Sequence, residues 1–304
     1  MAVEAQVRAE GAAGAGAALL RVAADYVSLL KPRVILLLLV TELGAMIVAA
    51  RGWPGAGVTL GSLLGGALAA GGAGAINCWF DRDIDAVMPR TRRRPIAAGR
   101  ITPAAGLAFG IAVALSGVAL VAVSSNVLAA GLTAAGGLVY VFVYTIWLKR
   151  TTPQNIVIGG AAGAFPPLVG WAAVTGSLSP LAWVLFAVIF LWTPPHFWAL
   201  ALVLRRQYAA ANVPMLPVVV GGGRTRRAIV AYTIPMLAVS LLPWIWLGPI
   251  YGFGAIVFGG VFLVLAWRAS RTEAGHDAFT LFHYSLAYLA LLFVAASVAA
   301  VVRI

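Results

Sequence analysis

The sequence predicts an all-α integral membrane protein of about nine transmembrane helices. Of its 304 residues, 62% are hydrophobic, and the mean hydropathy of +0.98 is far above that of a soluble domain. Apolar segments of near-spanning length recur along the chain, and breaks rich in Gly, Pro or charge separate them. The net charge of +12 does not indicate nucleic-acid binding, because the positive charges lie in the connections between spans. The single cysteine, Cys78, excludes a disulfide framework.

Two domains are predicted, a short N-terminal arm over residues 1–25 and a transmembrane domain over residues 26–304. Residues 1–20 are rich in Ala and Gly and lack an apolar core long enough for a signal peptide. The amphipathic pattern of residues 19–32 predicts a helix that lies on the membrane surface.

Nine apolar segments have the length that a membrane-spanning helix needs, about 20 residues. The predicted spans are residues 34–50, 57–80, 102–123, 125–147, 154–175, 180–204, 228–247, 250–267 and 279–301.

The distribution of positive charge predicts the topology. Nineteen of the 21 Lys and Arg residues precede the first span or lie in the connections that follow even-numbered spans. Arg51 and Arg303 fall on the other side. By the positive-inside rule we expect a cytoplasmic N-terminus, cytoplasmic charged connections and a C-terminus outside, which agrees with an odd number of spans.

The stretch from Asn77 to Arg100 concentrates charge between two apolar segments. It holds three of the nine acidic residues and six of the 21 Lys and Arg residues. Asn77, Asp81 and Asp85 are four residues apart, so on a helix they face one way while Asp83 faces the other. Two carboxylates about 6 Å apart repel by roughly 3 kcal/mol at an effective dielectric near 20, and a cation between them removes this penalty.

Carboxylate and amide oxygens are ligands that suit Mg²⁺, whose coordination is commonly completed by water and substrate phosphates. The guanidinium groups that follow in the sequence match phosphate oxygens. The stretch therefore predicts a Mg²⁺-diphosphate site at the end of a membrane helix. A solvated loop that only sets topology would explain the Arg residues but not the acids.

Other polar residues lie in or near the apolar spans. Glu42 is in the middle of the first span, so we expect it to face the bundle interior, in either a functional or a structural role. Lys149 and Arg150 end the fourth span, where they either anchor the helix or, as we favour, reach a diphosphate.

A double proline interrupts the sixth span in the motif WTPPHFW and predicts an opened helix that lines a cavity. His196 would lie roughly 12 Å deep, where it could ligate a haem iron, relay a proton or hydrogen-bond a carbonyl. His283, at the start of the ninth span, is a weaker candidate.

Several of these stretches resemble one family. The spacing of Asn77, Asp81 and Asp85 resembles the first Asp-rich motif of the UbiA superfamily of intramembrane prenyltransferases. The resemblance covers about residues 26–295, and RTRRRP together with TPPHFW is specific to the branch that farnesylates haem. The stretches that resemble this branch are KPRV (31–34), DIDAVMPRTRRRP (83–95), YTIWLKR (144–150), NIVIGGAAGAFPPLVGW (155–171), TPPHFWALAL (193–202) and VPMLPVV (213–219).

The resemblance implies nine helices in a ring around a central cavity that opens to the cytoplasm and, in part, to lipid. It implies that Mg²⁺ joins the Asp motif to farnesyl diphosphate, and that the farnesyl group and water add to a vinyl group of haem B to give haem O. The residue roles it implies are Asn77, Asp81 and Asp85 for Mg²⁺ and diphosphate, Arg90, Arg94, Lys149 and Arg150 for the leaving diphosphate, and His196 for the haem.

The implied location is the plasma membrane of a bacterium, and the implied partners are membrane lipid and, downstream, a haem A synthase or a terminal oxidase. Gln207 departs from the family pattern, which has an Asp before Tyr208, and this puts a metal role for that loop in question. Four aromatic residues expected near the cavity either stabilise an allylic cation by their ring faces or only pack; they are Tyr144, Phe165, Trp192 and Phe197.

Two other functions remain open. A prenyltransferase for an aromatic acid or a quinone precursor would use the same Asp motif, and absence of haem binding would favour it. A secondary transporter of an anionic solute would fit the broken helices and the intramembrane Glu42 and His196. Transporter sites lie near the midplane, however, whereas the charged residues here lie at a helix end.

Overall fold

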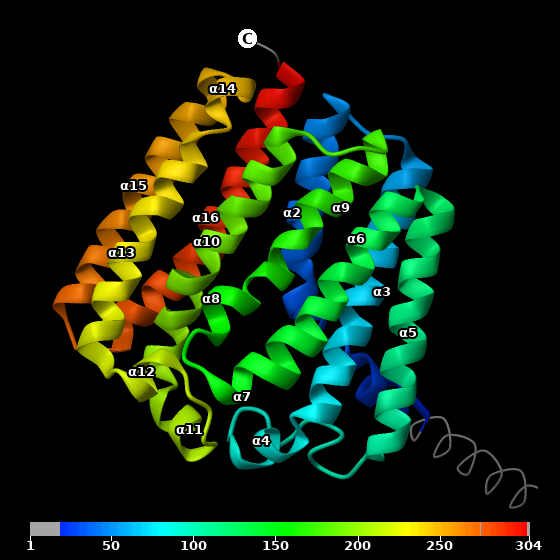
Figure 1. Cartoon of the computed structure of the whole chain (residues 1–304), viewed down its shortest axis with the longest axis vertical. Helices are drawn as coiled ribbons and strands as arrows, with labels where there is room; N and C mark the ends of the chain where they lie inside the picture. Colours follow the sequence, from blue (N-terminus) through cyan, green and yellow to red (C-terminus); the bar gives the residue numbers. More distant parts are fainter. Residues whose placement is uncertain (1–18, 274, 303–304) are drawn as a thin grey trace, which may run out of the picture.

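The computed structural model describes residues 19–273 and 275–302, in which the regular structure is helical throughout (Figure 1). Within this part of the chain, nine helical segments are long and apolar enough to cross a membrane. The first half contains α2 (Pro32–Ala50), α3 (Ala56–Phe80), α4 (Arg82–Val87), α5 (Pro103–Ser124), α6 (Val127–Leu138), the π-helix η1 (Val139–Leu148), α7 (Lys149–Thr151), α8 (Asn155–Gly159) and α9 (Ala161–Thr175). The second half contains α10 (Pro180–Val203), α11 (Arg205–Ala210), α12 (Leu216–Val219), α13 (Gly222–Leu241), α14 (Trp244–Leu247), α15 (Pro249–Arg271) and α16 (Gly275–Val302).

All nine predicted spans are confirmed. The largest difference in bounds is at α13, which begins at Gly222 rather than at residue 228. Its first turns carry Arg224, Arg226 and Arg227, so the helix continues into a polar region that the apolar pattern alone could not reveal. Most of the predicted arm, residues 1–18, lies outside the described residues, as does Arg303.

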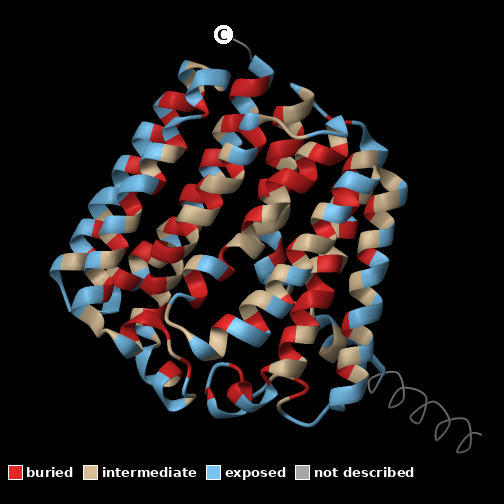
Figure 2. Cartoon of the chain, in the orientation of Figure 1, coloured by how far each residue is buried: buried red, intermediate tan, exposed pale blue. Residues whose placement is uncertain are grey.

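The helices form a closed arrangement in which α16 returns to pack against α2. Outward faces of α5 and α15 are exposed, with residues such as Leu115, Phe253 and Val264 on them (Figure 2). These apolar surfaces suit contact with lipid, because no polar coat separates them from their surroundings. The chain is a multi-pass membrane protein.

The connections rich in charge gather at one end of the molecule, where α4, α7, α11 and α12 lie (Figure 1). The last turn of α16 lies at the opposite end. Residues 19–29 form the amphipathic helix expected near the N-terminus, with Leu19 and Leu20 exposed. This helix is joined to the bundle by Asp25, which accepts hydrogen bonds from Arg100 at 2.8 and 2.9 Å.

The double proline of α10 does not open the helix, so the prediction of an opened helix is wrong: α10 is helical from Pro180 to Val203. The predicted cavity lining is confirmed, because Trp192, Thr193 and Phe197 line the central cavity. Membrane helices tolerate interior prolines, and both Pro194 and Pro195 are buried within the bundle. Irregular backbone occurs instead in η1 and between α8 and α9, where Gly159 and Gly160 line the central cavity.

Glycines allow α3 and α5 to approach until their backbones touch. A Cβ atom on Gly72 would lie 2.6 Å from the Gly110 carbonyl oxygen and 2.7 Å from the Cα of Ala114. We expect Gly72→Ala to destabilise the bundle by about 1–3 kcal/mol, because rigid backbone has to move. Thermal unfolding in detergent checks this against Gly131→Ala, whose Cβ would meet nothing within 4 Å. Equal unfolding temperatures for the two variants would contradict it.

Candidate active site

The three polar residues of the Asp-rich stretch face one way, as their spacing predicts. Helical hydrogen bonds continue across the junction of α3 and α4, from the Asp81 amide to the Asn77 carbonyl at 2.9 Å and from the Asp85 amide to the Asp81 carbonyl at 2.8 Å. All three side chains are buried, and the Asn77 amide donates to Asp81 Oδ2 at 2.7 Å. We refer to Asn77, Asp81 and Asp85 as the Asp face.

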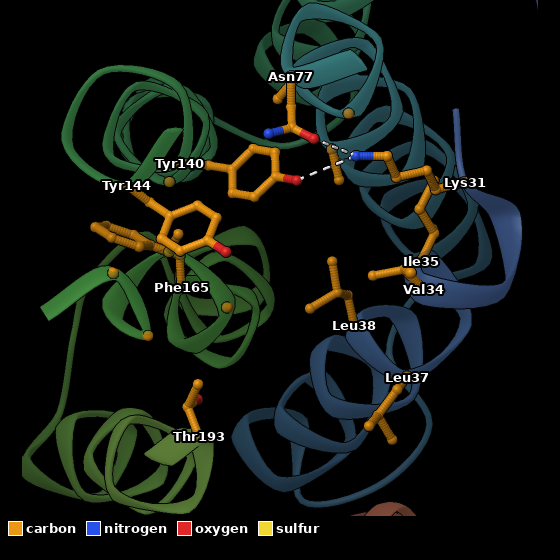
Figure 3. A pocket seen from close by; sticks show the side chains of 18 of the residues that line it. Lys31, Val34, Ile35, Leu37, Leu38, Asn77, Tyr140, Tyr144, Phe165 and Thr193 are labelled. Atoms are coloured by element: carbon orange, nitrogen blue, oxygen red, sulfur yellow. Dashed lines mark hydrogen bonds between the residues drawn. The ribbon is translucent and has the colours of Figure 1, made fainter. Parts of the chain in front are cut away.

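Each member of the Asp face is held by one cationic side chain. Lys31 Nζ donates to Asn77 Oδ1 at 2.6 Å and to the Tyr140 hydroxyl at 3.3 Å (Figure 3). Lys149 is hydrogen-bonded to Asp81 Oδ2. Arg94 donates to both oxygens of Asp85, at 2.9 and 2.8 Å. Because each carboxylate has at least one cationic partner, the charges of the buried acids are compensated within the protein.

Asn77 and Asp85 of the Asp face lie at the polar end of a cavity of about 420 Å³ that is otherwise lined mainly by apolar side chains, whereas Asp81 is fully buried and does not line it. Lys31, Asn77, Asp85, Arg90 and Arg94 line this end together with Lys149. The cavity therefore combines a charged head region with an apolar body, which is the shape of environment that an amphipathic anion requires.

The oxygen donors present fit Mg²⁺. Asp81 Oδ1 is buried and has no hydrogen-bond partner among the described residues, although Arg150 approaches it to 3.5 Å. In the described part of the chain, no group of three or more His, Cys, Asp or Glu side chains could enclose a metal. Two carboxylates and one amide suit a cation that keeps several waters and shares phosphate oxygens.

Arg150 is placed differently from the other predicted cations. Its guanidinium donates to both oxygens of Asp83 at 2.7 Å, and it does not line the large cavity. Asp83 points away from the Asp face, as its position in the sequence predicts, and its side chain is 61% exposed. The role of Arg150 in binding a leaving diphosphate stays a prediction.

Removing the charge of Asp83 is expected to leave the dependence of the reaction rate on pH unaltered. Hydrogen bonds from Arg150 lower the pKa of Asp83 to about 2 from an ordinary value of 3.8. A lowered pKa means that the pair is fully formed above the ordinary value and is lost as the pH falls through about 2. We expect Asp83→Asn to leave the pH–rate profile between about pH 5 and 9 unchanged, and a displaced profile would contradict this assignment.

His196 lies beside the cavity wall rather than in it. Its ring stacks between Trp192 and Phe282, with centroids 4.2 and 4.8 Å away, and its Nδ1 lies 2.5 Å from the Ser285 hydroxyl. His196 does not line the cavity, whereas Trp192 does. A contact between His196 and haem stays a prediction. His283 is exposed and hydrogen-bonds within its own helix, to the Phe279 carbonyl at 2.9 Å.

The four aromatic residues expected near the cavity all line it; they are Tyr144, Phe165, Trp192 and Phe197. Glu42 faces the interior as expected, lines the same cavity and accepts a hydrogen bond from Ser62 at 2.7 Å. Gln207 does not line the cavity, and its buried Oε1 has no partner among the described residues.

Lys31 was not assigned a role from the sequence. The signal available was a lysine directly before the proline that begins the first span, in the KPRV stretch. Its φ of 56° places it in the left-handed region, which turns the chain from the helix over residues 19–29 into α2 and brings Lys31 to Asn77.

The fold and the site together define a class of protein: a membrane-embedded bundle with a buried acid and cation cluster at the head of an apolar cavity. Comparison with known proteins identifies the family. The sequence matches the UbiA prenyltransferase family over residues 38–300. The chain therefore belongs to the UbiA prenyltransferase family.

Individual relatives are similar over nearly the whole chain. A protein of Acidiphilium cryptum named protoheme IX farnesyltransferase is 50% identical over 89% of this chain and 89% of its own length. One of the same name from Roseiflexus sp. strain RS-1 is 54% identical over 91% of this chain, which spans 52% of that relative's length. The solved structure of a UbiA homolog from Archaeoglobus fulgidus bound to GPP and Mg²⁺ has the same fold, with a TM-score of 0.63 at 15% identity, covering 90% of this chain and 99% of the other.

Proposed function

We propose that this protein transfers the farnesyl group of farnesyl diphosphate to a vinyl group of haem B, with addition of water, to give haem O and diphosphate. The observation that carries the proposal is the cationic head of the apolar cavity, which accommodates a diphosphate joined to a hydrocarbon chain. The choice of haem as acceptor is supported by the relatives named protoheme IX farnesyltransferase at about half identity.

We propose that the Asp face holds Mg²⁺. Asp81 Oδ1 has no hydrogen-bond partner among the described residues and is therefore available to a cation. The carboxylates of Asp81 and Asp85 are both buried. When bound, Mg²⁺ supplies positive charge beside the leaving diphosphate. The solved structure of a family member with Mg²⁺ and a prenyl diphosphate supports this role.

The cationic residues of the head region bind and orient the diphosphate. Four cations (Lys31, Arg90, Arg94 and Lys149) stand against the two carboxylates of the Asp face, so the head carries an excess of positive charge. As the bond between C1 of the farnesyl group and oxygen breaks, its electron pair leaves with the diphosphate. Cationic donors at this end of the cavity stabilise the growing negative charge on the diphosphate.

The body of the cavity protects the allylic cation that remains. The aromatic and aliphatic wall excludes water, and the ring faces of Tyr144 and Trp192 stabilise positive charge. The terminal carbon of the haem vinyl group bonds to C1, which leaves a cation on the carbon next to the porphyrin. Water adds to that carbon and loses a proton, giving the hydroxyl group.

We further propose that the protein lies in the plasma membrane of a bacterium with its charged end in the cytoplasm. Nineteen of its 21 Lys and Arg residues belong to that end by sequence position, and the positive-inside rule orients such an end inward. A haem A synthase or a terminal oxidase would receive the product.

Competition between acceptors tests the proposal. Purified protein in lipid is given farnesyl diphosphate, Mg²⁺ and equal amounts of haem B and 4-hydroxybenzoate, and both acceptors are analysed by mass. We expect only haem to gain the farnesyl group. Farnesylation of the aromatic acid alone would show that the acceptor is an aromatic acid and not haem. Anion flux without prenyl transfer would indicate a transporter.

A further inference from the structure

Glu42 lines the cavity and has one carboxyl oxygen to which no described residue donates a hydrogen bond. Its side chain is buried, and Ser62 fixes one oxygen, Oε1, by a hydrogen bond of 2.7 Å. The other oxygen, Oε2, lies over Gly66, where a Cβ atom would be only 2.7 Å away. Because residue 66 has no side chain, the carboxyl fits against α3 at this point, and no described residue donates a hydrogen bond to Oε2. Both residues line the cavity.

The carboxyl also marks the far end of the cavity. Among the residues of α2 and α3, all of which the structure describes, Glu42 and Gly66 are the cavity-lining positions farthest from the Asp face. Beyond them α9 packs directly on α2, because a Cβ on Gly170 would collide with the Glu42 carbonyl and lie 2.9 Å from Met46. The wall is therefore closed behind Glu42.

Two helices give the same distance between the charged head and this end. Gly66 and Asn77 are eleven residues apart on the continuous α3, and so are Lys31 and Glu42 along α2, which corresponds to about 16 Å in each case. With bonds near 1.5 Å and angles near 111°, the twelve-carbon main chain of a farnesyl group extends about 14 Å, and a fourth isoprene unit adds about 5 Å. Three isoprene units match this distance along the helices, and four exceed it.

We propose that Glu42 limits the length of the prenyl donor to three isoprene units. The inference rests on the proposed function in one respect, namely that a prenyl diphosphate binds with its head at the Asp face. A fourth unit would cover Glu42 Oε2 with hydrocarbon, and burying a polar group without a partner is costly. Glu42 takes no part in bond breaking, because C1 of the donor lies at the opposite end of the cavity.

Binding of unreactive donors tests this limit without any acceptor, so failure of the haem assignment would not affect the result. Thiolodiphosphate analogues of geranyl, farnesyl and geranylgeranyl diphosphate are titrated against the intact protein in lipid nanodiscs with Mg²⁺. We expect affinity to rise from geranyl to farnesyl and to fall about tenfold or more at geranylgeranyl. Equal or tighter binding of the geranylgeranyl analogue to the wild-type protein would overturn the proposal.

Two substitutions at residue 42 distinguish the effect of the size and polarity of the Glu42 side chain from the effect of its charge. Glu42→Ala is expected to abolish the discrimination between farnesyl and geranylgeranyl analogues, because the cavity gains space and loses its polar end. Glu42→Gln keeps the size and the hydrogen-bonding oxygen and is expected to retain the discrimination. A preserved preference in Glu42→Ala, in protein whose farnesyl binding is intact, would overturn the assignment; if that variant does not fold, the wild-type series decides.

Discussion

Asp81→Asn is expected to lower kcat for farnesyl transfer by about 10²–10³-fold, the loss typical when a group that stabilises transition-state charge is removed. Asp81 is fully buried, is hydrogen-bonded to Asn77 and Lys149, and keeps one oxygen without a partner. The amide has nearly the same shape but no charge, so it weakens the hold on Mg²⁺ and leaves Lys149 without its counter-ion. The formation of farnesylated haem is followed under saturating substrates.

Asp83→Asn is the matched control, because it makes the same chemical change two residues away on the opposite side. Its carboxylate is largely exposed and faces Arg150, and exposed ion pairs contribute little. We expect a rate near that of the wild type. Equal losses in the two variants would show that the whole segment, rather than the Asp face, is sensitive to substitution, and would contradict the proposed site.

Lys31→Met is expected to lower kcat/KM for farnesyl diphosphate by about 10–100-fold, which corresponds to the loss of one charge-assisted hydrogen bond. Lys31 reaches Asn77 from a different helix and lines the head of the cavity, so it is available to a diphosphate bound there. Methionine keeps most of the length of the lysine side chain and removes its charged amino group. Initial rates at limiting donor concentration measure the effect.

Arg33→Met provides the comparison for Lys31, since it removes a positive charge from the same helix start but from an exposed side chain. A small change in kcat/KM is expected, because a solvated charge at this distance acts only through long-range attraction. If both variants lose donor affinity equally, the general positive field of this end explains binding and Lys31 has no specific contact.

The spans and the Asp face could be predicted because both depend on regularities within one helix. The length of an apolar segment is enough to predict a membrane helix, and a spacing of four residues places side chains on one face of a helix. Neither rule depends on which residues the helix packs against. The same spacing rule correctly predicted that Asp83 points away from Asp81 and Asp85. Helix ends were less predictable, as α13 shows, because polar residues extend a helix without contributing to the apolar pattern.

Contacts between helices could not be predicted in the same way. Lys149 and Arg150 are adjacent in sequence, yet the first is hydrogen-bonded to Asp81, whereas the second makes its hydrogen bonds to Asp83 and approaches Asp81 only to 3.5 Å. The direction of each side chain depends on how η1 and α7 meet α3 and α4. Lys31 reaches Asn77 only because two helices pack side by side, which its own sequence neighbourhood does not show.

Local rules also failed where tertiary packing outweighed them. Two prolines in succession predict a broken helix, but α10 stays regular through Pro194 and Pro195, both of which are buried against neighbours. The contact of His196 with haem stays a prediction, since its ring stacks between Trp192 and Phe282 and does not line the cavity. Burial of a polar side chain indicates that it has partners, and does not identify them.

The central claim, that this protein joins farnesyl and water to haem, is tested most directly by mass analysis of the haem it produces. Purified protein is incubated with haem B, farnesyl diphosphate and Mg²⁺ in water enriched in heavy oxygen, with a chelated sample in parallel. The proposed function predicts a haem that has gained one farnesyl group and one labelled hydroxyl group, and no product after chelation. Unchanged haem in protein that binds farnesyl diphosphate, or a farnesylated haem without oxygen from water, would contradict it.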